Sequence, residues 1–314
     1  MTLRTAFFTR LLDDASPTER FRLALEQIQH SERFGVGRAW IAQHHFRAAE
    51  GGLPSPFVFI AHAAAHTSEI RLGTGVVTLT LEDPVRVAED AVVADLLAGG
   101  RVDLGLGSGG TPTSFAPFGL ALENKTADYE RKLAALVAAL AGEELPAGNR
   151  LHPPAGSLAD RVWQATFSAA GGVRAGVHGH GLLLSRTQPR PADRPEASLA
   201  EIQKPIVDAY LAALPAGAAP RITASRNVFV SETPVDAAAS AHPEQADAHV
   251  GTPEQVIASL SADATLRHAD EIAFQVPDVH TPHALILRSI ELFATEVAPA
   301  LGWDATAPAI ERTS

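Results

Sequence analysis

Short apolar segments alternate with amphipathic segments along the whole chain. The apolar segments lack the strict two-residue alternation of half-exposed strands, so they predict strands that are buried on both faces. The segments between them carry apolar residues at helical spacing; after Phe21, these recur at Leu25, Ile28 and Phe34. The pattern predicts eight strands, at residues 3–8, 38–42, 70–79, 102–106, 162–166, 181–185, 222–230 and 271–276.

Turn and capping residues mark where the intervening helices begin. The quartets Ser16-Pro17-Thr18-Glu19 and Thr252-Pro253-Glu254-Gln255 are capping boxes, in which a hydroxyl and a Glu or Gln side chain satisfy free backbone N–H groups. Further helices are expected at about 56–67, from Asp83-Pro84 to Gly99-Gly100, at 128–140, from Ser168, at 199–214 and from Thr281-Pro282. Residues 142–156 and 231–251 interrupt the rhythm and are expected to be loop excursions.

This order of elements predicts an α/β protein. Eight buried strands separated by helices favour a closed (β/α)8 TIM barrel that occupies residues 1–314 as a single domain. The pattern indicates the order of the strands along the chain more firmly than whether they close into a ring. An open doubly wound sheet therefore stays possible. No internal repeat or linker divides the chain.

Composition narrows the class of protein. The chain is 46% hydrophobic and 19% charged, which suits a soluble enzyme with a large core, and its net charge of −11 argues against a nucleic-acid partner. The absence of cysteine excludes disulfides, thiolate nucleophiles and iron–sulfur sites. We expect no membrane span, because no apolar run approaches about 20 residues. With no secretory signal at the amino terminus, the expected location is cytoplasmic.

Two adjacent histidines follow the second predicted strand. In the segment AWIAQHHF, the apolar strand leads directly into Gln43, His44 and His45. Active sites of parallel barrels lie at the carboxyl ends of their strands, and histidine exchanges protons near neutral pH. An extended segment directs successive side chains to opposite sides, so only one of the two rings is expected to face a site there. A pair of loop histidines with no chemical role is the alternative.

Other motifs carry weaker signals. The segment 105–110 contains G-x-G-x-x-G, but no helix follows it at once, which argues against a dinucleotide-binding fold. His62 and His66 have metal-ligand spacing, yet no third ligand is evident, so we expect no metal site. Ser168 can cap a helix, and the free N–H groups of that helix can also bind an anion.

Several segments taken together resemble the luciferase-like monooxygenases, the flavin-dependent barrel family that includes bacterial luciferase. They are AWIAQHHF, LGTGVVTLTLEDPVRVAEDAVVADLLAGGRVDLGLGSGG, VWQATFS, GLLLSR and GTPEQ, in family order between about residues 20 and 300. The stretch LLLSRTQPRP is similar to a subgroup of FMN-dependent members for which the family gives no defined substrate. The resemblance therefore implies a chemistry and a cofactor rather than a substrate.

The resemblance implies a catalytic role for His44, the first histidine of a Glu-His-His triplet that lies beside the flavin ring. Here Gln43 replaces the glutamate, which removes a charge that would raise the pKa of His44. The glutamine can still hydrogen-bond and so orient the ring. The family often has a non-prolyl cis peptide under the flavin ring, and Gly75-Val76 is its expected position here; an ordinary buried strand is the alternative.

Cofactor binding is implied for a further group of residues. Ser108 and Gly109 would let backbone N–H groups approach the flavin phosphate, and Phe167, Ser168 and Ala169 begin the helix that would face it. Many relatives have an arginine where Ser108 stands. Its absence is expected to move the phosphate-binding cation elsewhere, with Arg186 as the candidate.

The resemblance implies a reduced-FMN-dependent monooxygenase that uses dioxygen on an unknown small organic substrate. We see no nicotinamide site, so a separate flavin reductase is the expected electron source. A homodimer through the helices that follow the second and third strands is also expected. Two alternatives stay open: a deazaflavin-dependent hydride-transfer enzyme on the same barrel, and a flavin-binding protein without catalysis.

Overall fold

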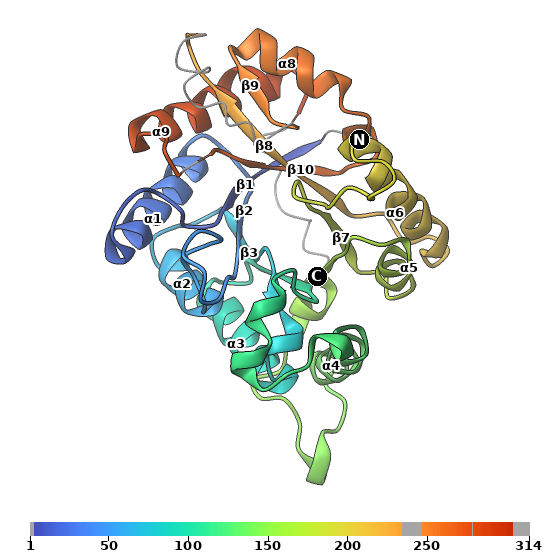
Figure 1. The fold of residues 1–314 in the computed structure, drawn as a ribbon. Coiled ribbons are helices and arrows are strands. Elements are labelled where there is room, and N and C mark those ends of the chain that lie inside the picture. The colour runs from blue at the N-terminus through green and yellow to red at the C-terminus, as the bar shows by residue number, and fades with distance from the viewer. Residues whose placement is uncertain (1–2, 234–246, 278, 304–314) are drawn as a thin grey trace.

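The computed structural model describes residues 3–233, 247–277 and 279–303, and its centre is a closed parallel barrel (Figure 1). The barrel strands are β1 (Arg4–Thr9), β2 (Arg38–Ile41), β3 (Arg71–Thr74), β5 (Val102–Gly107), β6 (Val162–Ala165), β7 (Gly181–Leu184), β8 (Ile222–Val230) and β10 (Glu271–Gln275). Strand β10 pairs in parallel with both β1 and β8, which closes the ring. The predicted (β/α)8 barrel is confirmed, and the open sheet is excluded.

Helices surround the barrel on its outside (Figure 1). They are α1 (Pro17–Arg33), α2 (Pro56–Ala64), α3 (Pro84–Leu97), α4 (Lys125–Leu140), α5 (Ala169–Val177), α6 (Leu199–Ala213), α8 (Pro253–Ala262), α9 (His283–Leu292) and the short α10 (Ala298–Ala300). Both predicted capping boxes begin helices: Ser16 Oγ accepts from the Glu19 N–H at 3.3 Å, and Gln255 Oε1 accepts from the Thr252 N–H at 3.0 Å.

The prediction of one continuous third strand, at residues 70–79, is wrong. The structure divides residues 70–79 into β3 and the two-residue strand β4 (Val77–Thr78), followed by a 3₁₀ turn at Leu79–Leu81. The division falls at Gly75-Val76, whose peptide bond is cis, as the resemblance implies. Beyond it, β4 pairs with β5 instead of continuing the ladder with β2.

The first expected excursion lies outside the barrel. Residues 142–156 extend away from the end of α4 and contain an isolated bridge between Leu145 and Asn149 (Figure 1). Part of 231–251, residues 234–246, lies outside the described residues. Its last residues form β9 (His249–Gly251), which pairs with the upper part of β8 and was not predicted as a strand.

A buried ionic cluster fills the amino-terminal end of the barrel. Arg38 donates to Asp103 at 3.1 Å and forms a second, short ion pair with Glu271. The indole N–H of Trp40 donates to Glu271 at 2.8 Å, and that of Trp163 donates to Asp103 at 3.3 Å. These contacts join β2, β5, β6 and β10 inside the barrel. They lie below the space enclosed by the carboxyl-terminal half of the strands.

The two tryptophan rings form the layer above this cluster, packed edge to face with centroids 5.5 Å apart. Glycine in the neighbouring strands makes room for them. A Cβ on Gly73 would lie 2.4 Å from the Trp40 ring, and one on Gly181 would lie 2.1 Å from the Trp163 ring. Ala6, Leu183 and Ala273 complete this apolar floor.

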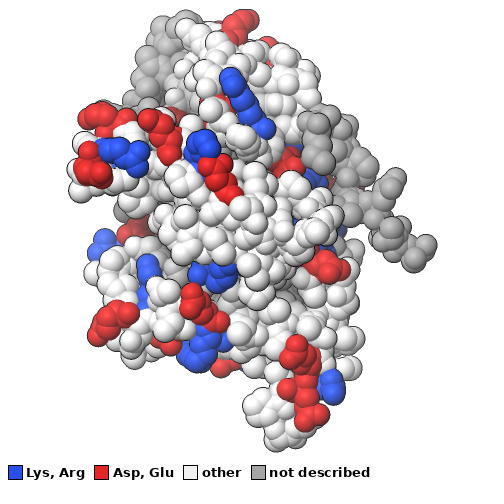
Figure 2. Space-filling model, turned by 90° about the vertical axis from the view of Figure 1, so that its right-hand side faces the viewer, with Lys and Arg blue, Asp and Glu red and all other residues white. Residues whose placement is uncertain are grey.

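The face over α5 and α6, shown in Figure 2, carries mixed charge. Lys and Arg side chains alternate with Asp and Glu, and the described residues on this face form no continuous basic area. Within the described ranges, no helix combines the length and the apolar character needed to cross a membrane.

Candidate active site

A pocket of about 860 Å³ opens at the carboxyl ends of the barrel strands. Its floor includes Trp40 and Leu183, and its walls are the loops that follow β2, β3, β5, β6 and β7. Eight of the nine residues selected from the sequence line it: His44, Gly75, Val76, Ser108, Gly109, Phe167, Ser168 and Arg186. Ala169 does not; it is the first residue of α5.

His44 is held at one end of this pocket by the loop that follows it. Its backbone N–H donates to the Leu53 carbonyl at 2.9 Å, which folds the loop back over the strand end. Gly51 then packs on the ring, since a Cβ there would lie 2.4 Å from His44 Nδ1. Nδ1 is buried and has no hydrogen-bond partner among the described residues.

The surroundings of His44 keep its imidazole neutral. Burial lowers its pKa to about 4, and the nearby charges of Arg10 and Arg186 act in the same direction, while Glu50 acts in the opposite one. At neutral pH the ring therefore has a free lone pair and can accept a proton or a hydrogen bond. His45 turns to the rim of the pocket, with its ring edge-on to Phe118 at a centroid distance of 5.1 Å.

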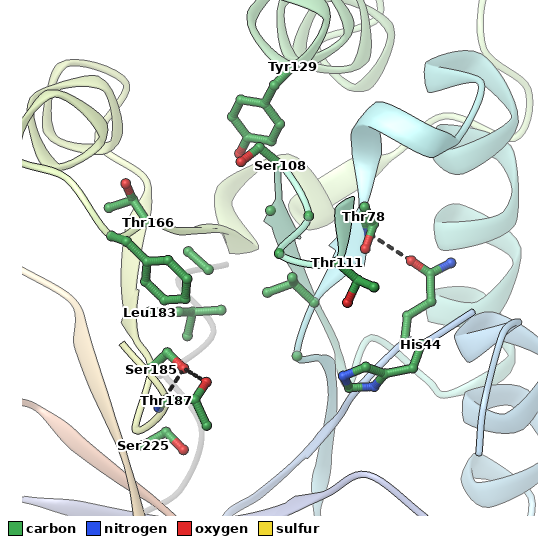
Figure 3. A pocket seen from close by; sticks show the side chains of 18 of the residues that line it. His44, Thr78, Ser108, Thr111, Tyr129, Thr166, Leu183, Ser185, Thr187 and Ser225 are labelled. Carbon is green, nitrogen blue, oxygen red and sulfur yellow. Dashed lines mark hydrogen bonds between the residues drawn. The ribbon is translucent and has the colours of Figure 1, made fainter. Parts of the chain in front are cut away.

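Gln43 does not orient the His44 ring, contrary to the expectation from the sequence. Its Oε1 accepts from the Thr78 N–H at 2.7 Å (Figure 3), and its Nε2 donates to Glu82 at 2.7 Å and to the Pro54 carbonyl at 3.1 Å. The amide thus joins β2 to the segment after the cis peptide. A glutamate here could make neither donation and would face the Glu82 carboxylate.

Hydroxyl groups face His44 across the pocket (Figure 3). The Ser185 and Thr187 hydroxyls, after β7, hydrogen-bond each other at 2.9 Å. The Ser225 hydroxyl on β8 is buried and has no partner among the described residues. This wall therefore offers hydrogen-bonding groups to a polar molecule.

The other end of the pocket contains Ser108, Tyr129 and Thr166 (Figure 3). Here Ser168 caps α5, because its Oγ accepts from the Gly171 N–H at 3.2 Å. Three cations that were not selected from the sequence also line the pocket: Arg10, Lys125 and Arg174. Ala170 and Arg174 both line the pocket and are four residues apart in α5, so helical spacing from Ala170, two residues after Ser168, was the signal that could have revealed Arg174.

Arg186, the cation expected near the phosphate, is directed towards β8 and β1. Its Nε donates to Asn227 Oδ1 at 2.8 Å, and its guanidinium lies 4.9 Å from the centroid of the Phe8 ring. It lowers the pKa of His44, so it belongs to the His44 end of the pocket.

His62 on α2 and His66, just beyond the end of that helix, are exposed and lie together, with ring centroids 4.5 Å apart. His66 Nδ1 is 2.8 Å from the His62 carbonyl oxygen. In the part of the chain that the structure describes, no three His, Asp or Glu side chains are grouped so that they could hold a metal ion.

Comparisons with known proteins agree with this geometry. The family model for luciferase-like monooxygenases matches residues 1–271. The chain is 34% identical over 173 residues to the uncharacterized protein y4vJ of Sinorhizobium fredii, a match that covers 52% of this chain and 49% of that protein. It is 32% identical over 174 residues to limonene 1,2-monooxygenase of Rhodococcus erythropolis, which covers 52% and 45%. The chain thus spans about half the length of the curated relatives it matches.

Three solved structures share the fold. The monooxygenase RslO1 of Streptomyces bottropensis superposes with a TM-score of 0.80 at 23% identity, over 95% of this chain and 99% of that one. The oxygenating constituent of 3,6-diketocamphane monooxygenase of Pseudomonas putida, solved with FMN, gives 0.76 at 18% identity, over 95% and 98%. An F420-dependent secondary alcohol dehydrogenase gives 0.71 at 12% identity, over 96% and 99%.

The family match covers residues 1–271, which is most of the chain, and the solved structures share its fold. The chain belongs to the luciferase-like monooxygenase family.

Proposed function

We propose that this protein is a reduced-FMN-dependent monooxygenase that acts with dioxygen on a small organic substrate. The observation that carries the proposal is a pocket that holds the neutral His44 at one end, with Arg10 and Arg186 nearby, and Arg174 and Lys125 beside Tyr129 and Gly109 at the other. FMN has the same division, with a polar ring at one end and a phosphate at the other. The residues at the two ends of the pocket therefore fit the two ends of FMN.

Unsatisfied polar atoms inside the pocket support the fit. His44 Nδ1 and Ser225 Oγ are buried without a partner among the described residues. Burial of a polar atom without a hydrogen bond costs about 1–3 kcal/mol, so both sites favour a ligand that supplies one. Trp40, Val76 and Leu183 offer the apolar surface on which a flat ring can pack.

When bound, reduced FMN supplies the electrons that activate dioxygen. The chain's own residues then have three tasks. Neutral His44 accepts a proton at its free ring nitrogen, the Ser185, Thr187 and Ser225 hydroxyls orient the bound molecule, and the apolar floor excludes water. A separate flavin reductase would supply the reduced cofactor, as the words "oxygenating constituent" imply for the Pseudomonas putida relative.

The test is to incubate the protein with an unrelated flavin reductase, FMN and a panel of candidate substrates under isotopically labelled dioxygen. The expected result is label in a product that forms only with the protein. Hydrogen transfer to a substrate without label, and only with deazaflavin, would favour the hydride-transfer alternative, which shares the fold with the alcohol dehydrogenase. Tight FMN binding with no product across the panel would favour a non-catalytic flavin protein.

We also propose a homodimer formed through α2 and α3. Four apolar side chains on these helices are exposed to solvent: Val58 at 73%, Val93 at 47%, Leu96 at 60% and Leu97 at 66%. Exposed apolar side chains gathered on adjacent helices are typical of protein interfaces. Light scattering should give twice the chain mass at micromolar concentration, and a mass of one chain would count against the dimer.

A further inference from the structure

We propose that Arg174, assisted by Lys125, is the residue by which this chain recognises a phosphate monoester, so that the pocket selects FMN over riboflavin. The inference rests on the proposed function and adds to it a specificity-determining residue. The phosphate-binding cation would then lie on helix α5 and not at the end of β5, where Ser108 replaces the arginine of many relatives.

The position of Arg174 is the first argument. The side chain lines the pocket and is only 20% exposed. The end of the pocket that it shares with Ser108, Tyr129 and Thr166 lies opposite His44 (Figure 3). A molecule that extends from His44 towards this end would bring its far terminus to the guanidinium.

The orientation of Arg174 is fixed by two buried neighbours, Gln164 and Tyr129. Its Nε donates to Gln164 Oε1 at 3.0 Å, and its guanidinium lies 4.8 Å from the centroid of the Tyr129 ring. Gln164 is fully buried and is itself within 3.0 Å of His180 Nδ1. A guanidinium held in this way loses little freedom when it binds an oxyanion.

The guanidinium of Arg174 has two further polar partners. A side-chain hydrogen bond joins it to Tyr129. Its Nη1 donates to Glu130 at 3.4 Å, and the Glu130 side chain is 55% exposed. Exposed ion pairs contribute little to stability, so a phosphate can displace this carboxylate. The planar guanidinium also offers paired N–H groups that match two phosphate oxygens.

The neighbouring groups complete an anion site. The Lys125 ammonium donates to the Gly109 carbonyl at 3.2 Å, which places a second positive charge beside the loop after β5. Ser168 and Ala170, at the start of α5, also line the pocket, and the N-terminus of a helix favours an anion. Arg186 is no substitute, since its contacts with Asn227 and Phe8 direct it towards the His44 end.

The experiment compares the dissociation constants of FMN and riboflavin, measured by quenching of flavin fluorescence, for the wild type and for Arg174→Gln. The wild type should prefer FMN, and Arg174→Gln should weaken FMN binding roughly 10- to 100-fold while riboflavin binding stays within about threefold. Arg174→Lys keeps the charge and should recover part of the preference. Unchanged riboflavin binding also shows that each variant is folded.

Two further variants separate the outcomes. Arg131→Gln removes an exposed arginine of α4 that pairs with Asp128, and Arg186→Gln removes the rival cation; both should keep the preference for FMN. The inference is overturned if Arg174→Gln keeps the full preference, or if Arg186→Gln abolishes it. A wild type that binds neither flavin would instead contradict the proposed function.

Discussion

At the scale of single residues, His44 has the surroundings of a proton acceptor. Burial and the charges of Arg10 and Arg186 hold its pKa at about 4, well below the ordinary value of 6.5. The ring is therefore neutral throughout the physiological range. A group with this pKa serves as a base or hydrogen-bond acceptor and does not donate a proton from a charged form.

His44→Ala should keep FMN binding and lose turnover by about 10²- to 10⁴-fold, because general acid–base catalysis contributes this much. The binding constant and kcat are measured on the same preparation, with His62→Ala on the outside of α2 as the control. Turnover at the wild-type level in His44→Ala would remove His44 from the mechanism.

The pH profile of kcat/KM should show no ionisation of His44 between about pH 5 and 8. Activity should fall on acidification near pH 4, where the ring of the free enzyme takes up a proton. A titration with a midpoint near 6.5 that disappears in His44→Gln would show that the ring is accessible to water and would contradict the buried position.

Gln43 illustrates what the sequence cannot reveal about a residue. The resemblance marks it as a departure from Glu-His-His, but it does not show that the partner of the amide is Glu82, 39 residues further along the chain. In the same way, Arg174 is an ordinary helical arginine until α5 is placed beside the pocket. Residue roles that depend on contacts between loops are not visible in a local pattern.

Gln43→Glu should destabilise the protein by about 1–3 kcal/mol, because it loses donations to Glu82 and Pro54 and brings two carboxylates together. Adding Glu82→Gln should restore most of this loss, since one amide and one carboxylate are again paired. Urea unfolding of the two single variants and the double variant gives the coupling energy. Additive effects would show that the two side chains do not interact.

At the scale of elements, the strands could be predicted because burial on both faces gives long apolar runs. Seven of the eight predicted strands match to within one or two residues, and the exception is β3. The predicted segment stays apolar across the break at Gly75-Val76. The pattern therefore gives no sign that β5 pairs first with β3 and then with the separate strand β4. Strand β9 was missed because only three residues form it.

The ionic cluster that joins four strands should matter more to stability than any surface pair. Glu271→Gln would weaken the interactions with Arg38, Trp40 and Thr223 inside the barrel, at a cost on the order of 3–5 kcal/mol. Glu19→Gln, which breaks an exposed pair with Arg22, should leave the free energy of unfolding nearly unchanged. Both free energies of unfolding are measured in urea; equal costs would mean that the buried cluster contributes no more than the surface pair.

At the scale of the whole molecule, three buried histidines link stability to pH. Burial lowers the pKa of His44 and of His249 to about 4 and that of His180 to about 3, against 6.5 for an unperturbed ring. Between these values the unfolded chain binds protons that the folded protein does not. Stability therefore rises with pH in this window and is lost on acidification.

Urea unfolding between pH 7 and 4.5 should show a decline that begins near pH 6.5, with up to about 1.4 kcal/mol per pH unit from each of these histidines. His249→Gln should reduce the slope, while the exposed His62→Gln should not. A stability that is flat to pH 5 would show that these rings are not buried in solution.

The central claim is that the closed barrel holds a flavin against His44. The most direct measurement is a crystal structure of the protein with FMN. We expect the flavin ring beside His44 at the Gly75-Val76 segment and the phosphate at the end of the pocket that contains Ser108 and Arg174. A flavin bound elsewhere, or a ring with no contact to His44, would contradict it.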